Sequence, residues 1–140
     1  MPVSKKSARI AALIDGCQGQ ALDARYLGYF ACFNGQLFYE AHDVLEDLWL
    51  PARQGPHGSF YKGLIQLAGA FVHLQKNRLR PAASLFKLAR LNLQRYSPVH
   101  EQLDVTRILG LAEDWLARLE GAQFAKNPLT ETNAPQLSLL

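Results

Sequence analysis

The stretch FYEAHDVLEDLW, from Phe38 to Trp49, repeats apolar side chains at helical spacing. On a helical wheel of about 100° per residue these side chains fill one continuous arc, and Asp43 points away from it toward solvent. His42 and Glu46 stand one turn apart beside the arc, at a spacing that lets an imidazole and a carboxylate touch. The stretch therefore predicts an amphipathic helix with a histidine and a glutamate at the edge of its buried face.

The same helical period runs through most of the chain, and no alternating run bounded by turn residues indicates a strand. Asn34-Gly35 separates the first two helices, Pro51 ends the second, and the prolines and glycines of 51–59 indicate a loop. The predicted fold is all-α, a compact bundle of about five helices in a single domain. The expected helices cover 22–33, 36–50, 60–76, 81–96 and 102–119.

The chain has 140 residues, of which 49% are apolar, and this fits one globular domain. We expect 1–20 to be flexible or partly helical, 21–120 to form the helical bundle, and 121–140 to be an extended tail. The uncharged run 63–75 is shorter than the about 18 apolar residues that span a bilayer, so no membrane segment is expected. Two cysteines without disulfide or metal-site spacing, and no convincing signal peptide, favour the cytoplasm.

Basic side chains dominate the middle of the chain, where no acidic residue occurs between Asp47 and Glu101. Solvation, or pairing with neighbouring elements or subunits, is the simplest interpretation of this charge. The alternative is a site for a small anionic molecule such as a phosphate or a carboxylate. Nucleic acid is the less favoured partner, because no binding motif is present and no aromatic residues interleave with the basic ones.

The predicted helix over 60–76 is apolar around more than half of its circumference and carries one polar stripe. If this helix packs antiparallel to the helix over 36–50, the stripe would face His42 and Glu46 and form a polar pocket with them. A glycine in the stripe would let the two helices approach closely. The stripe consists of Lys62, Gln66, Gly69 and His73.

Two kinds of chemistry fit such a pocket. His42, Glu46 and His73 would supply the two imidazoles and one carboxylate of an open site for a divalent metal, although the motif spacings of zincins and di-iron bundles are absent. Without metal, Glu46 would orient His42 as a general acid or base, and Tyr39, Lys62 and Gln66 would position an anionic substrate.

A structural role is the alternative to both. A histidine at the rim of an apolar face is most often a satisfied core residue, and Glu46 would then be the hydrogen-bonding partner of His42 in a buried, stabilising pair. The protein would be an interaction module that self-associates as a homo-oligomer, with the apolar helices and the tail as its contacts.

Four segments of the chain resemble the bacterial and archaeal domain-of-unknown-function family 309. They are FN at 33–34, FYEAHDVLEDLW at 38–49, FYKGLIQLAGAFVHL at 60–74 and LFKLARLNLQRY at 85–96. In that family a pattern such as F-N, F-x-A-H-E-x-x-E-x-x-W and G-L-I-Q-x-A is typical. The resemblance covers about 26–98, implies a compact helical bundle and supplies no activity. The matching motif positions are Asn34, His42, Glu46, Trp49, Gly63, Gln66 and His73.

The resemblance adds Asn34 and Trp49 to the candidate ligand-binding residues, which are otherwise Tyr39, Lys62, Gln66 and His73. Two positions depart from the pattern. Asp43 stands where the family usually has Glu, and Asn77 stands where a Gly is common. We expect the first departure to have little effect, because the wheel places Asp43 in solvent.

Overall fold

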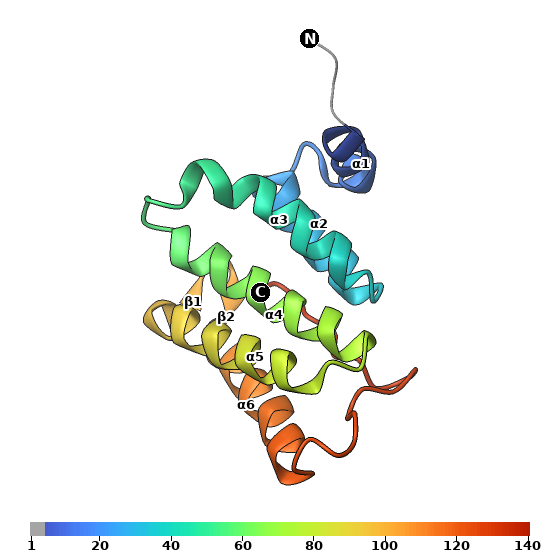
Figure 1. Ribbon diagram of the computed structural model, residues 1–140. Coiled ribbons are helices and arrows are strands. Elements are labelled where there is room, and N and C mark those ends of the chain that lie inside the picture. Colours follow the sequence, from blue (N-terminus) through green and yellow to red (C-terminus); the bar gives the residue numbers. More distant parts are fainter. Residues whose placement is uncertain (1–4) are drawn as a thin grey trace.

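Helix α4 (Gly58–Gln75) runs through the middle of the molecule, between α3 (Phe38–Ala52) and α5 (Leu79–Leu93) (Figure 1). Helix α2 (Ala24–Asn34) packs on α3, and α6 (Val105–Gly121) packs on α5. The computed structural model describes residues 5–140. Apart from one very short hairpin, the regular structure of these residues is helical, which confirms the predicted all-α bundle.

Helix α4 lies at the centre because most of its circumference is apolar and needs neighbours on several sides. Phe71 of α4 is fully buried and contacts one aromatic ring from each of four other helices. The ring centroids lie 5.1–5.5 Å from that of Phe71, a separation typical of favourable aromatic pairs. The four rings belong to Phe33 of α2, Phe38 of α3, Phe86 of α5 and Trp115 of α6.

Two glycines of α4 allow close contact with α5. A Cβ at Gly63 would lie 2.6 Å from Cγ of Leu93 and 3.2 Å from the backbone oxygen of Ala89, so only a glycine fits there without movement. A Cβ at Gly69 would lie 3.1 Å from Cδ1 of Leu85, which also belongs to α5. The expectation that Gly69 brings α3 and α4 together was therefore wrong, because this glycine faces α5.

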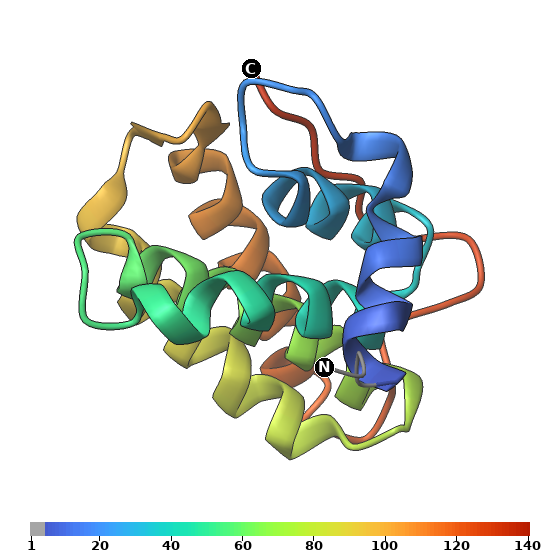
Figure 2. The ribbon, with the colours of Figure 1, turned by 90° about the horizontal axis from the view of Figure 1, so that it is seen from above.

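The expectation that Asp43 is a solvent-exposed charge was also wrong. Asp43 is only 5% exposed, and the guanidinium of Arg9 donates a hydrogen bond to its carboxylate. Arg9 belongs to α1 (Lys5–Leu13), which lies across α3 (Figure 2). A wheel drawn for α3 alone does not include a neighbouring helix, so it could not reveal this cover.

Helix ends differ slightly from the sequence-based ranges. Helix α3 includes Pro51 and ends at Ala52, and the single-turn helices η1 (Asp15–Cys17) and η2 (Gln94–Tyr96) follow α1 and α5. Strands β1 (Val99–His100) and β2 (Leu103–Asp104) pair antiparallel and precede α6 in the sequence. Strands of two residues are too short to show an alternating pattern, and the sequence therefore did not reveal this hairpin.

The C-terminal residues after α6 form no helix or strand, yet they pack back onto the bundle and pass α2 (Figure 2). Leu137 is 1% exposed and belongs to the hydrophobic core. None of the helices within 5–140 combines the length and the apolar composition that a membrane span requires.

Candidate functional site: a polar groove along helix α4

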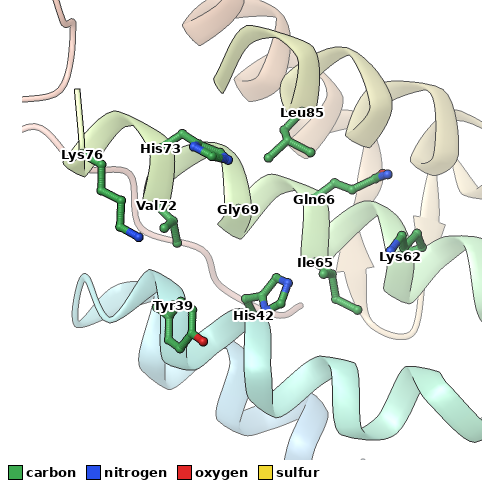
Figure 3. Close-up of a pocket in the computed structure, with 10 residues that line it drawn as sticks. All are labelled: Tyr39, His42, Lys62, Ile65, Gln66, Gly69, Val72, His73, Lys76 and Leu85. Atoms are coloured by element: carbon green, nitrogen blue, oxygen red, sulfur yellow. The ribbon is translucent and has the colours of Figure 1, made fainter. Parts of the chain in front are cut away.

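A groove with a volume of about 330 Å³ lies over the outward face of α4, between α3 and α5 (Figure 3). Its floor is the polar stripe of α4, whose residues recur every three or four positions and so share one face of the helix. Helix α3 and helix α5 supply the two walls. The lining residues are Tyr39, His42, Lys62, Ile65, Gln66, Gly69, Val72, His73, Lys76 and Leu85.

The structure brings His42 of α3 to the same groove as Gln66 and His73 of α4 (Figure 3). Glu46 does not line the groove. Its Oε1 accepts a hydrogen bond from Nζ of Lys6 at 3.1 Å, so this carboxylate is paired with α1. The two members of the predicted pair thus have different surroundings.

His42 lies between two carboxylates of its own helix. Its Nδ1 is 3.3 Å from Oδ1 of Asp43, and its Nε2 is 3.7 Å from Oε2 of Glu46, which is too long for a hydrogen bond. The side chains of His42 and Glu46 are 31% and 29% exposed. The idea that they form a buried pair was therefore wrong, because solvent reaches both side chains.

Gln66 is held in place by the neighbouring helix. Nδ2 of Asn92 on α5 donates a hydrogen bond of 2.7 Å to Oε1 of Gln66. This contact occupies the amide oxygen, so Nε2 is the group that Gln66 has available as a donor.

Nδ1 of His73 is buried and lacks a hydrogen-bonding partner. Within 5–140 it is the one side-chain nitrogen or oxygen atom of which this is true. Burial lowers the pKa of His73, and the positive charges of Arg78 and Lys76 lower this pKa further. The imidazole is therefore neutral at pH 7. An unpartnered buried nitrogen is uncommon in folded proteins.

The other candidate residues have different roles. Tyr39 and Lys62 line the groove, and Nζ of Lys62 lies 4.4 Å from the ring centre of Trp49, which itself lies outside the groove. Asn34 lies elsewhere, where its side chain exchanges two hydrogen bonds with the backbone of Leu137. Lys76 lines the groove but was absent from the sequence-based set, although it stands one turn after His73 on the same stripe.

The structure does not gather the predicted metal ligands. Among the residues from 5 to 140, His42, Glu46 and His73 do not approach one another closely enough to share an ion. The group that does so consists of His57, His100 and Glu101. Sequence reasoning missed this group because the unpredicted hairpin carries two of its members.

Residues 26–85 match a family model whose description is Domain of unknown function (DUF309). The match confirms the resemblance to the DUF309 family over these residues. No curated protein and no solved structure shows a significant match to the chain. The DUF309 match extends from α2 into the first half of α5 and includes every residue that lines the groove, from Tyr39 to Leu85. His100 and Glu101 lie beyond the matched residues.

Proposed function

We propose that the protein binds a small anionic molecule, with phosphate or carboxylate groups, in the groove along α4. The observation that carries this proposal is the charge of the lining. Lys62 and Lys76 line the groove, whereas no carboxylate among the described residues does so. The volume of about 330 Å³ lies at the small end of the range found for metabolite sites.

The two acidic side chains beside His42 are already paired. Glu46 accepts a hydrogen bond from Lys6, and Asp43 accepts one from Arg9, both from α1. These contacts compensate the negative charges of α3 on the side that α1 covers. Lys62 of α4 and Lys76, which directly follows this helix, therefore dominate the electrostatic attraction that an anion meets on entering the groove.

In this proposal each part of the lining has a different role. The ammonium groups of Lys62 and Lys76 attract and bind the anion, and Nε2 of Gln66 donates a hydrogen bond to it. The apolar side chains of Ile65 and Leu85 contact its carbon skeleton. His42 is the groove residue with carboxylates near both ring nitrogens, so it is the side chain best placed to move a proton.

The proposal is tested by thermal unfolding with pyrophosphate and, separately, citrate, each compared with sodium chloride at equal ionic strength. We expect at least one of the two anions to raise the thermal midpoint of the wild type, because a ligand that binds only the folded state stabilises it. Loss of a charged hydrogen bond in Lys76→Gln should weaken binding by about tenfold or more.

Lys126→Gln is the matched control, since Lys126 is exposed and lies outside the groove. It should respond to the anions as the wild type does. An equal response of Lys76→Gln, Lys62→Gln and the wild type would show that the anions act elsewhere, and no response of the wild type to either anion would contradict the proposal for these ligands.

Self-association is the second candidate function, and a pair of exposed leucines on α5 favours it. Leu88 and Leu91 are 43% and 57% exposed and stand one turn apart, so they form an apolar strip on the surface. If two chains pack through this strip, light scattering should give a dimer for the wild type and a monomer for Leu91→Glu. A monomeric wild type would rule out this function.

A further inference from the structure

Three side chains with metal-binding atoms meet at the N-terminal end of α4, away from the groove. His57 precedes the first residue of α4, His100 ends β1, and Glu101 follows it in the turn of the hairpin. None of the three lines the groove. Their contact depends on the hairpin, which places residues 100 and 101 beside the loop that joins α3 to α4.

The candidate ligand atoms lie close together. Nδ1 of His57 is 2.8 Å from Nε2 of His100 and 3.9 Å from Oε1 of Glu101. Each of the three residues offers one ligand atom, and these three atoms all lie within 4.8 Å of one another. Two ring nitrogens at 2.8 Å require a proton or a cation between them, because their lone pairs would otherwise repel.

Contacts from the rest of the fold hold the cluster in position. The ring of His100 lies 4.6 Å from that of Phe60 and 4.7 Å from that of Tyr96, measured between ring centres. The hydroxyl of Tyr96 donates a hydrogen bond of 2.9 Å to the backbone oxygen of Pro56, next to His57. The hydroxyl of Tyr26 donates one of 2.9 Å to the backbone oxygen of Glu101.

The turn that presents Glu101 has an unusual backbone. Glu101 and Gln102 have φ angles of 48° and 58°, in the left-handed region that favours glycine and asparagine. A two-residue hairpin turn with both φ angles positive usually contains such residues. Backbone strain of this kind is concentrated at functional sites, and here it occurs at the residue that supplies the carboxylate.

We propose that His57, His100 and Glu101 bind a zinc ion. Two imidazoles and one carboxylate are a donor set that zinc uses when a fourth position stays open to water or to another ligand. The side chains of His57 and Glu101 are 38% and 30% exposed, so solvent can reach that position. Zinc would replace the proton between the imidazoles, and tetrahedral bonds of about 2.0–2.1 Å would separate their nitrogens to about 3.3 Å.

The test is a calorimetric titration of zinc chloride into the full chain without an affinity tag, after treatment with EDTA and its removal. The titrated protein carries Cys17→Ser, which removes the partly exposed free thiol as a competing ligand. We expect about one zinc ion per chain. His57→Gln and Glu101→Gln should each weaken binding by about tenfold or more.

His42→Gln and Glu46→Gln are the controls, and both should bind zinc as the parent does. They also distinguish this cluster from the histidine and glutamate pair of α3. Circular dichroism verifies that each variant is folded, and Glu101→Gln is the variant least prone to unfold, because Tyr26 holds Glu101 by its backbone oxygen.

Nitrogen NMR of the imidazoles provides the second measurement. Zinc should shift the resonances of Nδ1 of His57 and Nε2 of His100 and leave those of His42 unchanged. The proposal is overturned if the parent does not bind zinc, or if folded His57→Gln and Glu101→Gln bind it with the parent's affinity.

Discussion

The guanidinium of Arg9 donates a hydrogen bond to the buried carboxylate of Asp43, and this ion pair joins α1 to α3. The two partners differ in exposure, since the side chain of Asp43 is 7% exposed and that of Arg9 is 46% exposed. Beside the pair, Ile10 and Ile14 pack on Val44 in a small hydrophobic cluster of their own. Together with the hydrogen bond from Lys6 to Glu46, these contacts hold the N-terminal helix against the bundle.

Arg9→Ala should lower the free energy of unfolding by about 1–3 kcal/mol, because it leaves a buried carboxylate without its cationic partner. Denaturation in urea measures this change. Arg53→Ala is the control, since Arg53 is an exposed arginine outside α1. If Arg9→Ala unfolds at the same urea concentration as Arg53→Ala and the wild type, the ion pair does not contribute to stability.

The ion pair between Arg9 and Asp43 shows which features of the structure could be predicted from the sequence and which could not. The helical period of 38–49 and the polar stripe of α4 are local patterns, so they predicted the helices and the meeting of His42 with Gln66 and His73 in one groove. The partner of Asp43 lies 34 residues away on α1, and no local pattern contains that information. The hairpin and the burial of Leu137 were missed for the same reason, since tertiary contacts determine both.

Gly63 and Gly110 provide a matched pair of helical glycines. Gly63→Ala should destabilise the protein by about 1–3 kcal/mol, because the new Cβ would lie 2.6 Å from Cγ of Leu93 and force α4 and α5 apart. Gly110→Ala on α6 should stabilise it by about 0.4–1 kcal/mol, since no atom beyond the adjacent helix backbone lies within 4 Å of that Cβ and alanine restricts the backbone of the unfolded chain. Thermal midpoints should therefore shift in opposite directions. Equal shifts would contradict the close packing of α4 on α5.

The lowered pKa of His73 makes stability depend on pH. The folded pKa lies below the ordinary value of 6.5, so the unfolded chain binds more protons as the pH falls through 6.5. The free energy of unfolding should therefore be highest above pH 6.5 and should fall as the pH drops toward the folded pKa. The lowered pKa of His100 acts in the same direction.

Urea denaturation at several pH values measures this dependence, in buffer with EDTA so that no metal binds to His100. His73→Gln should reduce the slope of stability against pH between about 7 and 5. Gln75→Ala, on the same helix, should retain the slope of the wild type. If His73→Gln also retains that slope, burial does not affect the protonation of His73.

Asn34 and Leu137 join the C-terminal segment to α2. Nδ2 of Asn34 donates to the backbone oxygen of Leu137, and Oδ1 of Asn34 accepts from its backbone nitrogen, both at 2.7 Å. Leu137 is 1% exposed, whereas Leu140 is 71% exposed. Asn34 therefore has a structural role in this chain, which is to fix the segment around Leu137 over the core.

Leu137→Ala should lower the free energy of unfolding by about 2–5 kcal/mol, because it removes a fully packed side chain and leaves a cavity. Leu140→Ala should change it by less than about 0.5 kcal/mol, since its side chain is exposed and only its backbone nitrogen bonds to Gln102. Asn34→Ala should cost about 1–3 kcal/mol by leaving two backbone groups of Leu137 unpaired. Urea denaturation separates the three variants, and a Leu137→Ala protein as stable as Leu140→Ala would show that the segment does not pack on the bundle in solution.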